Sequence, residues 1–396
     1  MYKITPAMGW NSWNTYGLDI SEKIILETTD FLISSGLKDV GYEYIVIDDG
    51  WSLKERDVNG RLVPDPIKFP HGIKYVSDYV HSKGLKFGMY SCAGAVTCGG
   101  YPGSFDHEFI DAKTFAEWGV DYLKYDYCFT SLSQKGSYLY KRMGVALANC
   151  GRDILFSACT GGMDDTRYWI KETGAHSWRS TCDILDNWKS IKDLIFSQMK
   201  TMELNGQGCF NDMDMLVVGM EGVGFVGKGG CTYDEYFTHF AFWCMFGSTL
   251  MIGSDIRKLS DEARAILFNK DLIRINQDKK YNQPFIINYR LTKNAEITVD
   301  NPYYLKNYSD ETTVFAKFLD DGKIAIGFFN LSDRVATSYE ARFVLDDIGI
   351  PESTGKTLKM RNVVNGEIKV VNNGFCFEDE IKPHCSKVYI CEIIDK

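Results

Sequence analysis

The chain has 396 residues, of which 45% are hydrophobic and 14% are aromatic, so it can bury a large core and is expected to contain more than one domain. Its net charge of −9 and isoelectric point near 5.3 argue against a nucleic-acid partner, because phosphate binding requires a basic surface. Its longest apolar runs have only the length of a strand, which argues against a membrane-spanning segment. A neutral or small polar substrate fits this composition better.

The amino-terminal segment and the cysteines bear on the cellular compartment. The start, MYKITPAMGWNSW, has no basic flank followed by an apolar stretch and therefore predicts no signal peptide. Taken as complete, the chain is expected to be cytoplasmic; removal of an export signal would make it extracellular. The twelve cysteines form no CxxC pair and no zinc-like spacing, so most are expected to be reduced and buried. The oligomeric state is left open, a homo-oligomer included.

The first 283 residues alternate between strand-like and helix-like segments. The strand-like segments end, in chain order, at Trp13, Asp49, Ser91, Asp126, Thr160, Thr181, Leu216 and Ser254. Amphipathic helical segments lie between them, for example over Glu22–Ser35, His71–Lys83, Ala112–Trp118, Ser137–Ala148 and Ile191–Met202. Eight such units predict an α/β fold, a (β/α)8 TIM barrel, whose active site lies at the carboxyl ends of the strands. A doubly wound open sheet is the main competitor, but no Gly-rich phosphate fingerprint follows any strand.

The remaining residues, 284–396, show a different pattern. Short alternating strands are separated by turn signals, and Asp321 followed by Gly322 between two such runs is typical of a hairpin. The pattern predicts a C-terminal antiparallel β-sandwich domain over 284–396, packed on a catalytic barrel over 1–283. Its strand ends carry no unusual polar residues, so we expect this domain to be structural.

The fourth predicted strand carries charge at its end. It lies in Val120–Cys128, VDYLKYDYC, where alternation places Lys124 and Asp126 on the same side. A buried ion pair is the structural alternative for these two residues. A Schiff-base aldolase would use Lys124, but it needs a lysine of low pKa, and Asp126 is expected to stabilise the ammonium instead.

The second predicted strand ends in two adjacent carboxylates, Asp48 and Asp49. Neighbouring side chains on a strand point in opposite directions, and Gly50 permits the bend that would keep both in one site. A helix cap plus a solvated aspartate is the structural alternative. Sugar hydroxyls or a metal ion would suit the pair. We favour hydroxyls and expect no metal, because no histidine lies nearby and magnesium would need another carboxylate.

Further candidates follow the later strands. Arg179 ends one strand and Asp183 follows it in the loop, whereas Asp186 is explained as the cap of the next helix. Other polar or aromatic residues at predicted strand ends are Asp212, Asp214, Trp10, Trp13 and Tyr90. The aromatic rings offer flat apolar faces that stack on sugars, although such rings are more often part of a core.

Several carboxylates, an arginine, a lysine and aromatic rings at one barrel mouth indicate glycoside hydrolysis. That reaction needs two carboxyl groups in different protonation states. We expect Asp126 to be the nucleophile, with its pKa held down by Lys124, and Asp183 to be the acid, provided that its surroundings raise its pKa. An inactive sugar-binding protein is the non-enzymatic alternative, which the presence of both carboxylates argues against.

Five motifs occur in order: MGWNSW, IDDGW, YLKYDYC, a WRS…D segment and NDMDML. Together they resemble glycoside hydrolase family 27 over the whole barrel. That family comprises α-galactosidases and α-N-acetylgalactosaminidases, with a few β-L-arabinopyranosidases and isomaltodextranases. The resemblance implies a retaining, exo-acting α-galactosidase that needs no cofactor and acts on a terminal α-galactoside. Asp126 would be its nucleophile and Asp183 its general acid/base.

The resemblance also implies how the sugar is bound. Asp48 and Asp49 would bind the axial O4 and the O6 of galactose. Lys124 would reach O3 and O4, and Arg179 would reach O2 and O3. The other pocket residues that it implies are Trp13, Tyr90, Cys98, Cys159, Thr160 and Asp214. A disulfide between Cys98 and Cys128 beside the nucleophile is implied as well, which a cytoplasmic location would put in question.

Two positions depart from the family pattern. Tyr127 follows the nucleophile, where the family usually has a small or amide residue. In SACTGG, Cys159 is kept, but Thr160, Gly161 and Gly162 replace large groups that meet the 2-position of the sugar in many α-galactosidases. Small residues there are typical of α-N-acetylgalactosaminidases, although the serine and alanine of that subgroup are absent. The expected order is α-galactosidase, then α-N-acetylgalactosaminidase, then β-L-arabinopyranosidase.

Overall fold

The computed structural model describes residues 5–131, 133–206, 208–287, 311–338, 340–371 and 374–396. The chain divides into two compact units, which are described separately. The first comprises Met1–Cys231 and Ser248–Arg264, and the second comprises Thr232–Gly247 and Ala265–Lys396. The chain therefore enters the second unit once, returns to the first, and enters the second again. In the part of the chain that the structure describes, no helix is both long enough and apolar enough to cross a membrane.

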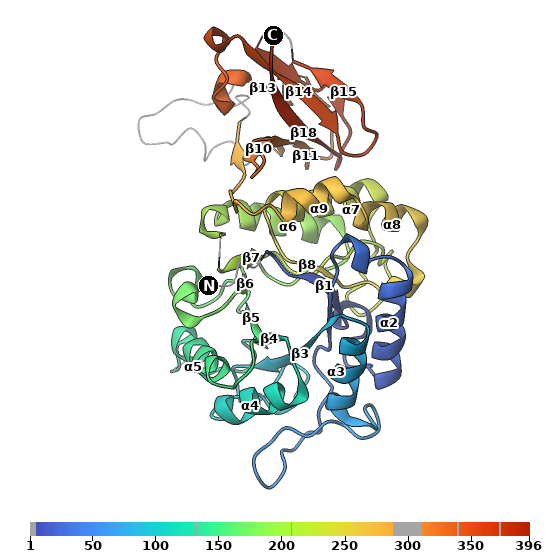
Figure 1. Cartoon of the computed structure of the whole chain (residues 1–396), viewed down its shortest axis with the longest axis vertical. Coiled ribbons are helices and arrows are strands. Elements are labelled where there is room, and N and C mark those ends of the chain that lie inside the picture. Colours follow the sequence, from blue (N-terminus) through green and yellow to red (C-terminus); the bar gives the residue numbers. More distant parts are fainter. Residues whose placement is uncertain (1–4, 132, 207, 288–310, 339, 372–373) are drawn as a thin grey trace. The chain divides into compact units, whose positions relative to one another are not determined.

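The first unit is built on eight parallel strands. They are β1 (Met8–Asn11), β2 (Tyr44–Val46), β3 (Lys86–Cys92), β4 (Tyr122–Asp126), β5 (Leu155–Cys159), β6 (Ser177–Arg179), β7 (Phe210–Asp212) and β8 (Leu250–Ile252). Their order in the sheet is β7-β6-β5-β4-β3-β2-β1-β8. A parallel bridge between Leu216 and Ile252 joins the two ends of this order. The predicted TIM-type barrel is thus confirmed, and Figure 1 looks into its ring of strands.

Helices surround these strands. The helices are α1 (Trp13–Tyr16), α2 (Glu22–Ser34), α3 (Gly72–Ser82), α4 (Glu108–Trp118), α5 (Gly136–Ala148), α6 (Trp188–Met199) and α8 (Asp261–Leu267), the last of which ends in the second unit. Short 3-10 helices cover Lys38–Val40, Thr166–Tyr168, Ile170–Thr173, Met202–Leu204 and Ile256–Lys258. Side-chain caps fix two starts: Ser21 accepts from the Ile24 N–H at α2, and Asn187 accepts from the Ser190 N–H at α6. The cap of α6 is therefore Asn187, and the prediction of Asp186 was wrong.

Six strands end earlier than predicted, namely β1, β2, β5, β6, β7 and β8. The chain leaves β1 at Asn11 and turns into α1, whose first residue, Trp13, donates its N–H to Oδ1 of Asn11 at 2.8 Å. β7 ends at Asp212, because Asp214 takes a left-handed backbone conformation with φ of 81°. Leu216 then meets β8 instead of extending β7. These turns carry polar side chains to the strand ends.

The second unit contains helices α7 (Tyr233–Met245) and α9 (Lys270–Asn276) and three antiparallel sheets. The largest sheet runs β15 (Ile368–Val370), β14 (Lys356–Asn362), β18 (Ser386–Asp395), β11 (Ile324–Asn330), β10 (Thr312–Phe318) and β9 (Phe285–Ile286). Two small sheets pair β12 (Ala336–Thr337) with β17 (Glu380–Ile381) and β13 (Arg342–Val344) with β16 (Phe375–Phe377). Short 3-10 helices cover Leu345–Ile348 and Glu352–Thr354. The predicted antiparallel class is confirmed, and the predicted hairpin joins β10 to β11 through Gly322, whose φ is 80°.

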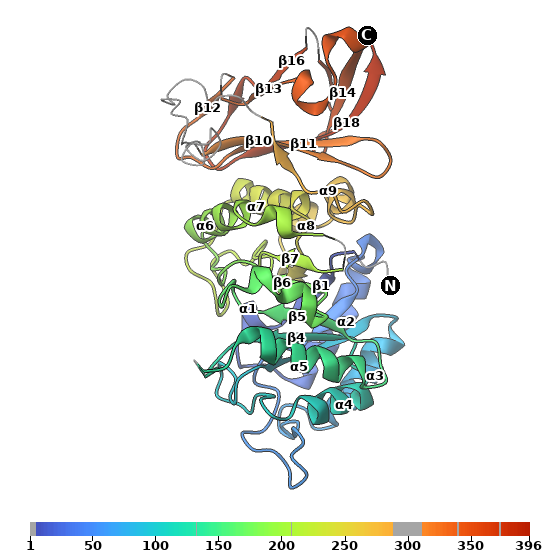
Figure 2. The same cartoon turned by 90° about the vertical axis from the view of Figure 1, so that its left-hand side faces the viewer.

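Both faces of the large sheet are buried. On one face, Val314 and Phe328 belong to a core cluster that also includes Phe343 of β13. On the other face, the ring centroids of Phe315 and Phe329 lie 5.8 and 4.1 Å from the ring centroid of Phe242 in α7. Figure 2 shows the short strands β12, β13 and β16 on the side of β10 and β11 away from α7. Every residue of α7 from position 238 to 245 is buried.

Candidate active site

Polar side chains gather at the carboxyl ends of the barrel strands. Asp126 is the last residue of β4, and its register partners are Cys92 of β3 and Cys159 of β5. Asp48 follows β2, and Arg179 ends β6. Parallel strands present these ends at one side of the sheet, so residues far apart in the sequence meet there.

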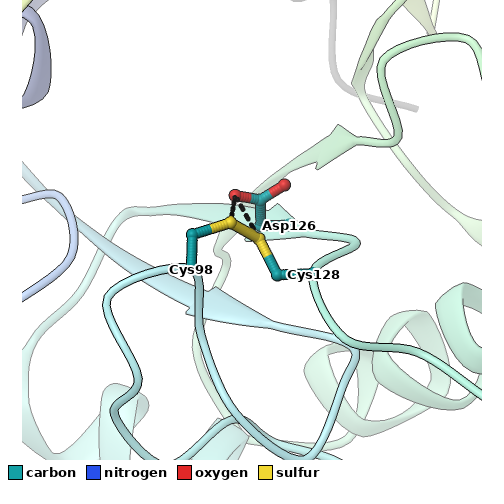
Figure 3. Close-up of side chains that lie close together, drawn as sticks. All are labelled: Cys98, Asp126 and Cys128. Atoms are coloured by element: carbon teal, nitrogen blue, oxygen red, sulfur yellow. Dashed lines mark hydrogen bonds between the residues drawn. A yellow bond between two sulfur atoms is a disulfide. The ribbon is translucent and has the colours of Figure 1, made fainter.

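The carboxylate of Asp126 is surrounded by well-defined partners. Its Oδ1 accepts the backbone N–H of Tyr127 at 2.8 Å, and its Oδ2 accepts the hydroxyl of Tyr90 at 2.8 Å. The sulfurs of Cys128 and Cys98 lie 3.4 and 3.8 Å from Oδ2 (Figure 3). The group is therefore held in one orientation on a rigid strand.

Burial raises the pKa of Asp126 above its usual range. The charge of Lys124, the N–H of Tyr127 and the hydroxyl of Tyr90 oppose this effect but do not cancel it. The expected lowering of this pKa is therefore wrong in direction. A neighbouring charge can be identified in the sequence, whereas the loss of water around the carboxylate depends on the tertiary structure.

Cys98 and Cys128 form a disulfide whose Cα atoms lie 5.5 Å apart, which confirms the implied pair. Among the other described cysteines, Cys182 is the exposed one. Asp126 and the two bridged sulfurs form a tight cluster, but sulfurs bonded to each other provide no thiolate for a metal ion. The disulfide instead ties the loop after β3 to the chain beyond β4.

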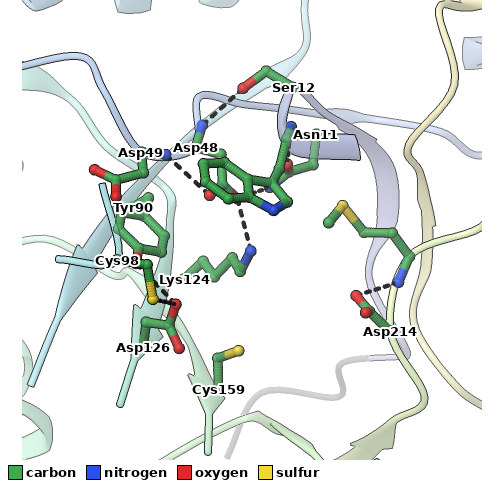
Figure 4. A network of polar contacts seen from close by, with 12 residues as sticks. Asn11, Ser12, Asp48, Asp49, Tyr90, Cys98, Lys124, Asp126, Cys159 and Asp214 are labelled. Atoms are coloured by element: carbon green, nitrogen blue, oxygen red, sulfur yellow. Dashed lines mark hydrogen bonds and ion pairs between the residues drawn. The ribbon is translucent and has the colours of Figure 1, made fainter. Parts of the chain in front are cut away.

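Asp48 links the first, second and fourth strands. Its Oδ2 accepts from Nδ2 of Asn11 and from Nζ of Lys124, both at 2.8 Å (Figure 4). Its own N–H donates to Oγ of Ser12 at 3.0 Å. Lys124 thus pairs with Asp48, and the alternative of a pair with Asp126 is wrong about the partner. The contact between strands distant in sequence could not be seen in the local pattern.

The Lys124 ammonium keeps its charge in this setting. Burial lowers its pKa, but Asp48, Cys159 and Asp126 together raise the pKa above the usual range of a lysine. Its Nζ also lies 5.5 Å from the centre of the Tyr90 ring. A Schiff-base lysine needs the opposite shift, which removes the support for an aldolase.

Asp49 points into the loop that follows β3. Its Oδ1 accepts from Oγ1 of Thr97 at 3.0 Å, and its Oδ2 accepts from the N–H of Gly99 at 2.7 Å. Burial raises its pKa, and these two bonds oppose the shift. Gly50 has a φ of 89°, which makes the predicted bend after the two carboxylates. Asp49 therefore also positions the loop that carries Cys98.

Arg179 links Asp183, the predicted acid, to the strand beside Asp126, the predicted nucleophile. Its buried Nη2 lies 2.9 Å from Oδ1 of Asp183 and 3.0 Å from Oδ2 of Asp214. Its Nη1 lies 3.6 Å from Sγ of Cys159, the register partner of Asp126. One guanidinium thus joins the Asp183 loop to the strand next to Asp126.

Asp183 differs from Asp126 in its exposure and in the direction of its pKa shift. Its side chain is 90% exposed, and the Arg179 guanidinium holds its pKa below the usual range. The raised pKa that the acid role would require is therefore absent from the protein alone. Water has open access to this carboxylate, so its protonation can respond strongly to a group that covers it.

Asp214 fixes the loop of Asp183. Its Oδ2 accepts the N–H of Ile184 at 2.8 Å, and its Oδ1 accepts the N–H of Met215 at 2.7 Å. Burial raises its pKa to about 6, against the effect of Arg179. A non-glycine residue with positive φ is strained, and such strain is maintained where surrounding contacts compensate for it.

The remaining predicted residues differ in how far they are buried. Thr160 is 1% exposed, and its Oγ1 accepts from the hydroxyl of Thr166 at 2.8 Å. Trp10 is fully buried and belongs to the core, whereas Trp13 is half-buried and packs edge-on against Phe225. Asn11 was not predicted as a site residue, although it lies in the MGWNSW motif, and Thr97 carries no local signal.

A family profile and a full-length relative both match this chain to α-galactosidases. The sequence profile of the family described as "Alpha galactosidase A" matches residues 5–278. The α-galactosidase of Cyamopsis tetragonoloba is 40% identical over 393 residues, which covers 98% of this chain and 86% of that protein.

Two solved structures are similar over nearly their whole length. α-Galactosidase I from Mortierella vinacea has a TM-score of 0.85 and 31% identity, with 99% of this chain and 97% of that chain covered. The α-galactosidase of Saccharomyces cerevisiae with raffinose has a TM-score of 0.84 and 28% identity, with 98% of both chains covered.

Proposed function

This chain belongs to the α-galactosidase (melibiase) family, glycoside hydrolase family 27, and we propose that it removes terminal α-linked galactose by a retaining double displacement. The observation that carries this proposal is the contrast between two carboxylates at one barrel mouth. Asp126 is held by Tyr90 and Tyr127 in a fixed orientation, whereas Asp183 is exposed and paired with Arg179. Carboxyl groups in different environments are what two-carboxylate glycosidases need.

In the first step, one oxygen of Asp126 attacks the anomeric carbon of the galactoside. A bond forms between that oxygen and the carbon, and the glycosidic C–O bond breaks with its electron pair going to the leaving oxygen. Asp183 gives its proton to that oxygen. The fixed contacts of Asp126 support this role, because a nucleophile in one orientation loses little entropy in the attack.

In the second step, the oxygen of a water molecule attacks the anomeric carbon of the galactosyl ester, and Asp183 takes up the proton of the water. The bond between that carbon and the Asp126 oxygen breaks, with its electron pair returning to the carboxylate. The anomeric configuration has then been inverted twice and is retained. A bound sugar would exclude water from Asp183 and raise its pKa, which would let it hold the proton for the first step. Loss of the negative charge on Asp126 in the ester lowers that pKa again, as a base requires.

The contacts around the site suit a galactose ring in front of Asp126. Lys124 stays charged beside Asp48, so ammonium and carboxylate together can bind neighbouring hydroxyls. Arg179 offers a guanidinium on the opposite flank. We propose that these groups bind the sugar as the family resemblance implies. The raffinose in the yeast relative is in accord with a galactoside substrate.

Tyr90→Phe tests the setting of Asp126. The Tyr90 hydroxyl stabilises the ionised carboxylate, so its loss raises the pKa of Asp126 further. Attack requires the ionised form, and we therefore expect the acid limb of the kcat/KM profile to move to higher pH. Tyr125→Phe is the control, because Tyr125 lies on the other side of β4. An unmoved limb in Tyr90→Phe would contradict the nucleophile assignment.

A second candidate activity is that of an α-N-acetylgalactosaminidase. Gly161 and Gly162 carry no side chains beside Cys159, and their φ values of 59° and 75° disfavour larger residues there. A substituent at the 2-position of the sugar would find space at this point. Thr160 is buried, and its Oγ1 accepts the hydroxyl of Thr166.

The deciding experiment compares kcat/KM on the 4-nitrophenyl derivatives of α-galactose, α-N-acetylgalactosamine and β-L-arabinopyranose. We expect the α-galactoside to be the best substrate and, by proton NMR, α-galactose to be the first product. Dominant N-acetyl activity would select the second candidate. β-Galactose as the first product would exclude the double displacement, and inactivity on all three would favour a sugar-binding protein.

A further inference from the structure

A glycine-rich loop between β7 and α7 joins the two sides of the barrel mouth. Its Phe225 and Val226 donate their N–H groups to the carbonyls of Thr15 and Asn14, both at 3.1 Å. This end of the loop therefore lies along the α1 segment that begins with Trp13.

The same loop is also bound to the segment that carries Asp183. The N–H of Asp186 donates to the carbonyl of Val226 at 3.1 Å, and the Gly230 N–H donates to the carbonyl of Asp186 at 3.0 Å. The buried carboxylate of Asp186 accepts the N–H of Gly222 at 2.7 Å. Asp186 is three residues from Asp183, so the loop spans from the Trp13 corner to the Asp183 corner.

Phe225 is the large side chain that this loop places at the Trp13 corner. Its ring packs edge-on against Trp13, with the centroids 5.1 Å apart. Gly17 lies directly against the ring, because a Cβ added there would come within 2.9 Å of it. Although both neighbours hold the ring in place, it remains 55% exposed, while Trp13 is half-buried.

The position of the leaving group in the reaction indicates what the exposed Phe225 ring contacts. The acid must lie against the glycosidic oxygen, so the leaving group sits beside Asp183, on the segment to which the loop is bound through Asp186. We propose that Phe225 forms the platform on which the first sugar of the leaving group stacks, and that it selects substrates by their leaving group. The inference rests on the proposed function, because it takes Asp183 as the acid.

A sugar fits this platform better than a lipid chain does. A single exposed ring matches the C–H face of one sugar unit. Val223 is the other exposed apolar residue of this loop, and its remaining exposed residues over 221–230 are glycines and the polar Lys228 and Glu221. A lipid tail would require a continuous apolar surface instead.

The test measures kcat/KM for Phe225→Ala on two substrates. The leaving group of melibiose is a sugar, whereas that of α-galactosyl fluoride is a fluoride ion, which cannot stack on a ring. We expect the variant to lose about tenfold on melibiose and nothing on the fluoride. Phe225→Tyr keeps the ring and should retain the melibiose activity. Phe109→Ala is the matched control, because Phe109 on α4 is also 55% exposed.

The possible outcomes separate the two proposals. Equal losses on both substrates would mean that Phe225 only supports Trp13, and no loss on either would mean that the leaving sugar does not touch it. Either result overturns the platform while the proposed activity stands. A wild-type protein inactive on both substrates would overturn the proposed function and the platform with it.

Discussion

Asp126→Asn is expected to reduce kcat on 4-nitrophenyl α-galactoside by about 10⁴-fold or more, because the amide cannot form the covalent ester. Asparagine has nearly the same shape, and its amide oxygen can still accept the N–H of Tyr127. Galactose binding, measured by calorimetry, should therefore survive. A variant that binds the sugar but does not turn it over would separate the nucleophile from the binding residues.

The control for this variant is Asp121→Asn. Asp121 directly precedes β4 and contacts His81 and Arg152, so it probes the opposite end of the same strand. Its replacement should cost stability rather than kcat. As a further test, azide added to Asp126→Ala should attack the anomeric carbon in place of the carboxylate and give β-galactosyl azide. Normal turnover by Asp126→Asn would remove this residue from the mechanism.

Asp183→Ala is expected to lower kcat/KM by about 10²- to 10⁴-fold on melibiose, whose leaving oxygen needs a proton. On 2,4-dinitrophenyl α-galactoside the loss should be small, because that leaving group departs without protonation. The ratio kcat/KM is the right quantity, since it reports the steps up to the first bond cleavage. The variant should also lose the basic limb of its pH profile.

Asp193→Ala provides the matched control for the acid. Asp193 is an exposed aspartate on α6 that pairs with Lys189, as Asp183 is an exposed aspartate that pairs with Arg179. Its replacement should leave both substrates unaffected. Equal losses on both substrates in Asp183→Ala would show that the residue has a structural role through Arg179 and is not the acid.

The barrel could be predicted because its signals are local. Each strand is an apolar run followed by polar residues, and each connecting helix has an amphipathic pattern, so the strands were identified although several ended early. The end of β7 shows most clearly what could not be predicted. The positive φ of Asp214 ends the strand, and the sequence NDMDML contains no signal for that turn.

The site shows the same division between local and tertiary information. The neighbours of Asp126 on its own strand could be placed on one face by alternation. The partner of Lys124 is Asp48, 76 positions earlier, and the burial that raises the pKa of Asp126 comes from the whole barrel mouth. Predictions of residue identity therefore needed only motifs, whereas predictions of charge state required the fold.

The buried helix α7 determines how this protein can be recombined with its relatives. The helix lies between β7 and β8 in the chain, yet its Phe242 shares a core with Phe315 and Phe329 of the large antiparallel sheet. A chimera that exchanged only residues 284–396 would place a foreign sheet against a native helix that has no exposed face from 238 to 245. A chimera that keeps this core intact must therefore transfer residues 232–247 together with 265–396, as two insertions from the same parent.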